Sequence, residues 1–214
     1  MLCEKGLWDK TNFTMYGGVV MNKVIGGVNP GSGGKRPEAG SKVIWLPTQS
    51  ARRHLEKMGK NPDEGIQLVR DGKVIPELET VFGLIKDHDA VLATAHVSPE
   101  EAFVVVEAAR RRVEKIVITH PEWWVCGYTL EDQIRLVKDY DVILERCYAQ
   151  NMGKGKKYHM NLRENAELIQ AVGYRHVWWI RTGDRRKIRT GKRKSMNTCI
   201  TWWNMGSRKN RCTT

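Results

Sequence analysis

The sequence predicts an α/β fold built around a parallel sheet of about six strands. Two observations lead to this prediction. Short apolar runs alternate with amphipathic helical stretches, and the runs are spaced so that one helix fits between neighbouring runs. Continuous apolar runs of this kind are typical of strands buried on both faces, as in parallel sheets. The expected strands lie at about 16–21, 42–46, 90–95, 115–119, 141–145 and 175–180.

The stretch 90–122 carries the most information. It contains an apolar run that ends at His96, a helix opened by Ser98 and Pro99, and a second apolar run that ends at His120. Serine suits the N-cap and proline the first helical position, so we expect a strand–helix–strand unit with parallel strands. Both histidines then lie at the carboxyl edge of the sheet, where the functional groups of α/β folds collect. Such a pair either binds a metal ion or forms a hydrogen-bonded pair without one.

The segments between the strands carry helix and turn signals. The dipeptide Asp71-Gly72 between two apolar runs predicts a hairpin with a type I′ turn. The helix that begins at Thr129 is expected to bury Leu130, Ile134 and Val137. Further helices are predicted over 76–88, 98–112 and 161–172, and residues 31–41 are predicted to form a flexible linker.

Composition limits the class of protein. No run of about 18 apolar residues and no export signal is found, so we expect a soluble, cytoplasmic protein without a membrane partner. The cysteines are odd in number and form no C-x-x-C pair, which favours reduced thiols over disulfides.

The net charge of +12 is unevenly distributed. Residues 181–214 carry eleven Lys or Arg and one Asp, so the remaining body is nearly neutral. We therefore divide the chain into a body, 1–180, and a basic tail, 181–214. The tail supports an alternative function, in which a non-enzymatic α/β protein contacts nucleic acid.

Several segments resemble an uncharacterised subfamily of the amidohydrolase superfamily of metal-dependent hydrolases. The resemblance covers about residues 16–180, and its most specific part is the pair of strands that end in histidine. The matching segments are Tyr16-Gly-Gly-Val-Val-Met-Asn22, Gly26-Gly-Val-Asn-Pro30, Val43-Ile-Trp-Leu-Pro-Thr48, Leu92-Ala-Thr-Ala-His96-Val-Ser-Pro-Glu-Glu101, Val117-Ile-Thr-His120-Pro-Glu122 and Ile143-Leu-Glu145.

The resemblance implies an incomplete (β/α)8 barrel, with the six strands as strands three to eight. It implies a divalent metal cofactor at the carboxyl edge, zinc or else manganese or iron, and a small-molecule substrate. His96 then matches the fifth-strand metal ligand and His120 the sixth-strand ligand. The superfamily's first-strand His-x-His is not found in this sequence, and Val177–Ile180 offers no eighth-strand Asp. We therefore expect a fragment with impaired or no hydrolase activity, and no catalytic residue is assigned.

Two further residues are candidates for the same site. Glu145 ends the strand after His120, and it is either a ligand, an acceptor for a histidine N–H, or a solvated carboxylate. His54 follows the strand at 42–46, and it either faces the site or lies on the surface. Glu122 is expected to be a carboxylate at a helix terminus.

The basic tail also suggests a shifted reading frame. In the neighbouring frame the codons of Trp178-Trp179-Ile180 force Val and then Asp, the acidic strand end that the resemblance implies. Residues 31–40 likewise permit an apolar helix in that frame. We therefore hypothesise that 31–40 and 181–214 are translated out of frame, which resequencing of the DNA tests.

Overall fold

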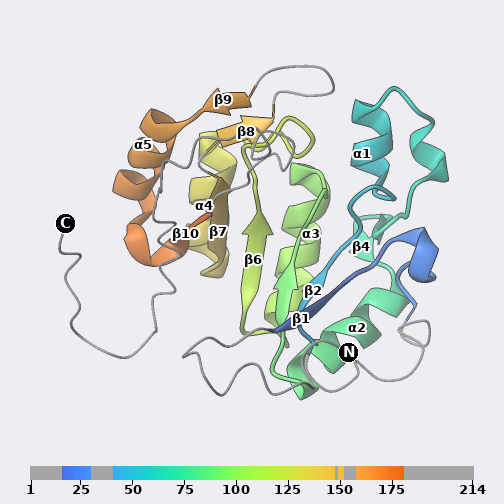
Figure 1. Cartoon of the computed structure of the whole chain (residues 1–214). Coiled ribbons are helices and arrows are strands. Elements are labelled where there is room, and N and C mark those ends of the chain that lie inside the picture. The colour runs from blue at the N-terminus through green and yellow to red at the C-terminus, as the bar shows by residue number, and fades with distance from the viewer. Residues whose placement is uncertain (1–15, 30–40, 148, 152–157, 181–214) are drawn as a thin grey trace, which may run out of the picture.

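The computed structural model describes residues 16–29, 41–147, 149–151 and 158–180. Within them, one parallel sheet of six strands has the order β1-β2-β5-β6-β7-β10 (Figure 1). The expected α/β fold with a parallel sheet is thus confirmed, and each strand lies within one or two residues of its expected range. The strands are β1 (Gly17–Val20), β2 (Ser41–Trp45), β5 (Val91–Ala93), β6 (Ile116–Thr119), β7 (Ile143–Cys147) and β10 (Val177–Ile180).

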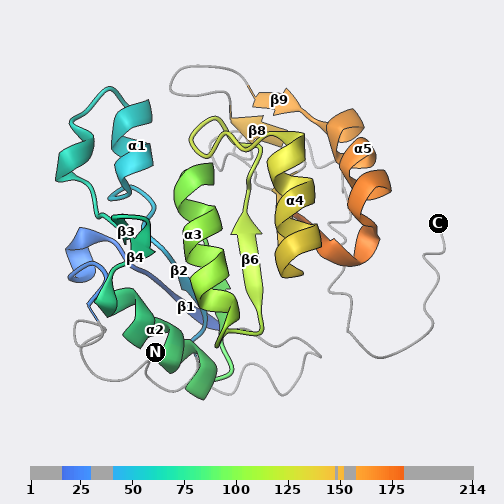
Figure 2. The ribbon, with the colours of Figure 1, turned by 180° about the vertical axis from the view of Figure 1, so that it is seen from behind.

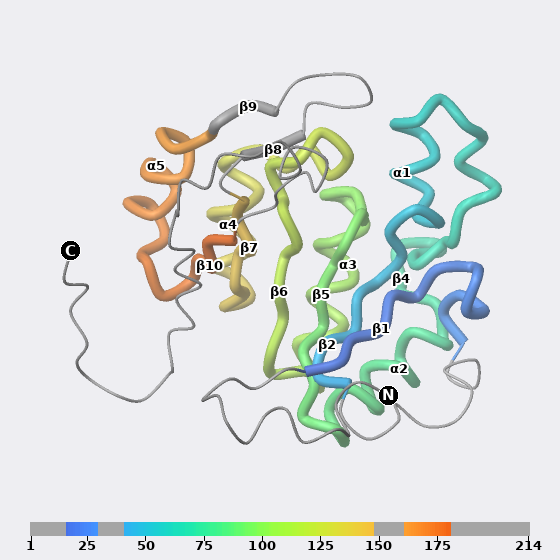
Figure 3. Tube along the Cα trace, in the orientation of Figure 1, coloured from blue at the N-terminus to red at the C-terminus, as the bar shows by residue number. Residues whose placement is uncertain are grey.

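The helices fill the connections between these strands. Figures 1 and 2, which view the molecule from opposite sides, show α2, α3 and α4 on one face of the sheet. The trace in Figure 3 shows β1 and β10 at the two ends of the sheet. The helices are α1 (Arg52–Lys57), α2 (Pro76–Asp87), α3 (Pro99–Arg110), α4 (Leu130–Tyr140) and α5 (Leu162–Val172), with short 3-10 turns at Lys23–Ile25, Pro62–Glu64 and Tyr174–His176.

The core lies between the sheet and the helices. Strand residues alternate between faces, so residues in register on neighbouring strands share a face. Leu92 pairs in register with Ile116, and Ile118 with Leu144; all four are buried in the same core cluster. The other face carries a second set of residues in register, namely Trp45, Ala93, Val117, Thr119 and Glu145.

Two short hairpins interrupt the alternation. The expected hairpin is confirmed as β3 (Val69–Arg70) and β4 (Lys73–Val74), and Asp71 and Gly72 have φ of 51° and 72°, as a type I′ turn requires. A second hairpin, β8 (Ala149–Asn151) and β9 (Tyr158–Met160), was not expected.

The inward face of α4 differs from the prediction. Val137 is buried as expected, but Gln133 and Leu136 are buried too, whereas Leu130 is 36% exposed. Ile134 is partly buried against the core, as expected. Gln133, a polar residue, is accommodated inside by hydrogen bonds with Arg146 and the Tyr128 carbonyl. Apolar periodicity alone places such a residue outside.

Several predictions fall on residues that are not described. The linker at 31–41 lies outside the described residues except for Ser41, and the basic tail lies outside them entirely. The nucleic-acid alternative and the frame hypothesis therefore stay predictions. No helix in the described part of the chain is long and apolar enough to cross a membrane.

Candidate metal centre

His96 and His120 lie together at the carboxyl edge of the sheet. His120 directly follows β6, and His96 follows β5 and donates its backbone N–H to the Pro47 carbonyl (3.2 Å). The two ring centroids are 5.1 Å apart, with an angle of 54° between the ring planes. The chain therefore brings both imidazoles to one place, although they are 24 residues apart in the sequence.

The backbone at both strand ends is strained. Ala95 has φ of 53° and His120 has φ of 30°, in a region that residues with a side chain rarely adopt. Strain of this kind persists only where the surrounding structure holds it, and it concentrates at functional sites.

His54 reaches the same place from α1. The loop before α1 is held by Asn22, whose Oδ1 accepts hydrogen bonds from the backbone N–H groups of Thr48 (3.0 Å) and Ser50 (3.1 Å). The Asn22 amide also donates to Thr48 Oγ1 (2.7 Å). One polar residue after β1 thus fixes the loop that leads into α1, the helix that carries His54.

His54 and His96 contact each other through their ring nitrogens. The two Nδ1 atoms are 2.8 Å apart, the centroids are 4.9 Å apart, and the ring planes differ by only 8°. Two neutral lone pairs at this distance would repel, so one Nδ1–H donates to the other nitrogen when no ion lies between them. His54 therefore faces the site rather than the surface.

Burial keeps these imidazoles neutral. Burial lowers the pKa of His96 to about 3, with smaller contributions from His120 and His54. Burial also lowers the pKa of His120 to about 4. The pKa of His54 is lowered as well, by burial and then by Lys60. All three rings are therefore neutral at pH 7, the form in which histidine binds a metal ion.

The loop after β6 surrounds His120. Its ring stacks on Trp123 at 4.3 Å between centroids, and its Nδ1 lies 3.4 Å from the sulfur of Cys126. Trp124, also from this loop, lies 6.4 Å from the His54 ring. The tryptophan pair thus packs against the histidines.

Glu145 lies in β7, on the sheet face opposite the helices. It pairs in register with Thr119, the residue before His120. Burial, and then the nearby Glu122, raises the pKa of the Glu145 carboxyl to about 7. A carboxyl with this pKa both takes and gives a proton at neutral pH.

Comparison with known proteins assigns the chain to a family. Residues 1–145 match the model of a family of unknown function, DUF6282. The chain belongs to the DUF6282 family. No curated protein and no solved structure matches it. The matched range includes His54, His96, His120 and Glu145 of this DUF6282 chain.

Glu122 is not a helix-terminus carboxylate, so that prediction was wrong. Its side chain is 7% exposed in the loop after β6, where its Oε1 accepts hydrogen bonds from the Cys147 N–H (2.8 Å) and the Asn161 amide (3.3 Å). Its Oε2 lies 3.7 Å from the buried Arg146 guanidinium. Arg146 also donates to Asn165 Oδ1 (2.6 Å) and Gln133 Oε1 (2.7 Å).

The buried network around Glu122 and Arg146 was not predicted from the sequence, although the sequence contains one signal for it. Arg146 stands inside the otherwise apolar run of β7, and a buried arginine requires acceptors. The network ties the loop that carries His120 to β7, α4 and α5 of the DUF6282 fold.

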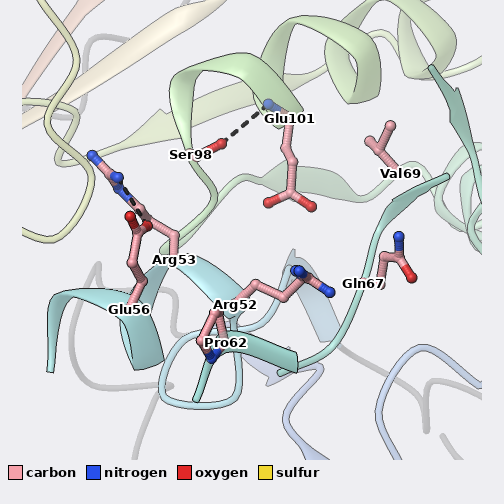
Figure 4. A pocket seen from close by; sticks show the side chains of 8 residues that line it. All are labelled: Arg52, Arg53, Glu56, Pro62, Gln67, Val69, Ser98 and Glu101. Carbon is pink, nitrogen blue, oxygen red and sulfur yellow. Dashed lines mark hydrogen bonds and ion pairs between the residues drawn. The ribbon is translucent and has the colours of Figure 1, made fainter. Parts of the chain in front are cut away.

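A pocket of about 350 Å³ opens beside α1 and the start of α3. Figure 4 shows the Glu101 carboxyl and the Arg52 guanidinium in it, and burial raises the pKa of Glu101. Arg52 is already paired with Asp63 (2.9 Å), and Arg53 with Glu56 (3.0 Å). Each of these two arginines therefore has a carboxylate partner within the protein.

The DUF6282 chain therefore gathers His54, His96 and His120, whereas Glu145 forms no hydrogen bond with them among the described residues. No group of three or more His, Cys, Asp or Glu side chains in this part of the chain is already arranged to hold one ion. The three rings are adjacent rather than directed at a common point.

Proposed function

We propose that the protein is a metal-dependent hydrolase of the amidohydrolase type for a small-molecule substrate, with impaired or no activity of its own. One observation carries the proposal: three neutral imidazoles from three separate elements meet at the carboxyl edge of a parallel sheet, with 2.8 Å between His54 Nδ1 and His96 Nδ1. Rigid strand ends that converge in this way are the usual setting of catalytic metal sites.

The strand order supports a barrel relationship. The six strands follow one another in chain order without reversal, whereas a doubly wound sheet reverses at a switch point. Helices on one face and sequential parallel strands are what a segment of a (β/α)8 barrel has. We infer that β1 to β10 of this sheet correspond to strands three to eight of such a barrel.

The donor types suit a divalent metal, but the rings would have to move before they could share one ion. Tetrahedral zinc, with Zn–N bonds of about 2.0–2.1 Å, holds its nitrogen ligands about 3.3 Å apart. The His54–His96 nitrogens at 2.8 Å would need to separate by about half an ångström. His54 and His96 would bind through Nδ1, and His120 through Nε2, because its Nδ1 contacts Cys126.

Unpartnered buried atoms add support. Trp123 Nε1 and Thr119 Oγ1 are buried and have no hydrogen-bond partner among the described residues. Trp123 stacks on His120, and Thr119 precedes it. A buried polar group without a partner costs free energy, which a water molecule or substrate atom in the site would recover.

A bound divalent metal would supply Lewis-acid chemistry, lowering the pKa of a water molecule so that it attacks a C–N, C–O or P–O bond. Among the protein's own groups, Glu145 is suited to hold the proton, because its pKa is about 7. Trp123 and Trp124 would limit the entry of bulk water. The first-strand and eighth-strand ligands implied by the resemblance are not among these residues, so metal binding is the property to measure before turnover.

The test is metal retention by the full chain. The protein is stripped with chelator, dialysed against one equivalent of zinc or manganese, and its bound metal is measured by mass spectrometry. We expect about one ion per chain for the unchanged protein, and loss of that ion in the double variant His96→Ala/His120→Ala. The matched control is His88→Ala, since His88 is exposed at the end of α2. Equal metal content in the double variant and the control would refute the proposal.

A further inference from the structure

The loop after β6 contains a thiol that contacts both histidine-bearing strand ends. Cys126 is fully buried, and its sulfur lies 3.4 Å from His120 Nδ1 and 3.4 Å from the Ala95 carbonyl oxygen. Ala95 is the residue before His96, and both Ala95 and His120 have positive φ. One sulfur atom thus contacts both positive-φ residues, Ala95 and His120, at the carboxyl edge of the sheet.

The proton positions follow from the donor count. A thiol has one proton, and an ordinary cysteine keeps it at neutral pH. The Ala95 carbonyl can only accept, so the thiol proton is best directed at it. The sulfur then remains as an acceptor for a hydrogen on His120 Nδ1.

We propose that Cys126 is a positioning residue that fixes His120 as the Nδ1–H tautomer, with the Nε2 lone pair directed away from the thiol. The role as a support for a metal ligand rests on the proposed function. Ligating histidines usually donate their second N–H to a carboxylate or a carbonyl, which sets the tautomer and the ring orientation. In this chain a buried thiol would do so, itself oriented by the neighbouring strand end.

The first experiment needs no metal. Long-range 1H–15N spectra of the metal-free full chain, labelled on histidine, report which nitrogen of each imidazole carries the proton. We expect His120 as Nδ1–H in the unchanged protein, and a shift toward Nε2–H in Cys126→Ala. The control is Val125→Ala, which removes buried packing from the same loop but no polar atom. It should leave the tautomer unchanged.

Two results would overturn the proposal. One is His120 in the Nε2–H form in the unchanged protein, because the thiol then donates to the ring. This result decides the matter even if Cys126→Ala fails to fold. The other is an unchanged Nδ1–H tautomer in a folded Cys126→Ala protein.

The second experiment measures zinc affinity by competition with a chromophoric chelator. Cys126→Ala should weaken binding about 10- to 100-fold, the usual effect of removing such a partner. Val125→Ala should bind zinc as the unchanged protein does, and equal affinity of all three proteins would count against the positioning role. If the unchanged protein binds no zinc but shows the expected tautomer shift, the proposed function fails while the tautomer assignment stands.

Discussion

The Glu122 carboxylate and the Arg146 guanidinium lie 3.7 Å apart, and their side chains are 7% and 3% exposed. This ion pair anchors the loop that carries His120. The pair joins this loop to β7, where Arg146 also donates to Asn165 and Gln133 and Glu122 accepts from the Cys147 N–H. The candidate metal centre therefore depends on a buried ionic network that lies outside it.

Loss of one partner of this pair should be costly. We expect Glu122→Ala to lower the free energy of unfolding by about 3–5 kcal/mol, because the Arg146 charge is left buried without its partner. Urea denaturation at pH 7 measures the loss. Asp139→Ala is the control, since it breaks the exposed Arg135–Asp139 pair (3.3 Å) and should cost at most about 1 kcal/mol. Equal effects of the two variants would contradict the account.

The histidines should make the metal-free protein sensitive to acid. His96 and His120 have folded-state pKa values of about 3 and 4, against 6.5 for an unperturbed histidine. Between these values the unfolded chain binds protons that the folded chain does not, so stability is complete above pH 6.5 and is lost as the pH falls. At pH 5, each of the two histidines should lower the free energy of unfolding by about 2 kcal/mol relative to its value above pH 6.5.

Urea denaturation of the protein, with chelator present to keep it metal-free, measures the free energy of unfolding at pH 7 and at pH 5. His96→Asn removes one titrating group, so it should reduce the difference between the two pH values by about 2 kcal/mol. His88→Asn, at an exposed position, should leave the difference unchanged. If the free energy of unfolding changes equally between pH 7 and pH 5 in His96→Asn and in His88→Asn, then His96 is not held neutral by burial.

Glu145 should act in the opposite direction. Its pKa rises from 4.5 to about 7 on folding, so the folded state binds the proton more tightly and stability falls as the pH rises from about 4.5 to 7. Glu145→Gln removes this cost, so we expect the metal-free variant to be more stable than the unchanged protein by about 3 kcal/mol at pH 8. The gain should vanish at pH 4. A variant that is less stable at pH 8 would show that the ionised carboxylate has a favourable partner.

Two glycines should respond oppositely to alanine. A Cβ at Gly65 would lie 2.6 Å from the Arg52 backbone, so Gly65→Ala must displace the start of α1 and should cost about 1–3 kcal/mol. It should also weaken zinc binding, because His54 moves with α1. A Cβ at Gly83 in α2 meets nothing within 4 Å, and Gly83→Ala should stabilise the helix by about 0.5–1 kcal/mol. Thermal and urea denaturation of both variants measure these changes, and a stabilising Gly65→Ala would contradict the packing described for α1.

Local signals were enough to predict the sheet and most helices. The apolar runs that end at His96 and His120 predict two parallel strands and hence one shared edge, and Asp71-Gly72 predicts its hairpin correctly. Each of these features depends on neighbours in the sequence.

The contacts between distant segments could not be read in this way. The position of His54 depends on Asn22, which holds the loop before α1 from 26 to 28 residues away. The burial of Glu122 depends on Arg146 in another strand. Polar pairs of this kind follow no period, and they become visible only when the sheet brings their elements together.

The zinc K-edge absorption spectrum of the zinc-loaded full chain at pH 7 reports which atoms are bound to the ion. We expect two or three imidazole nitrogens at about 2.0–2.1 Å, and fewer of them in His96→Ala. Coordination by oxygen alone, or by sulfur at about 2.3 Å, would contradict a histidine centre at this edge of the sheet.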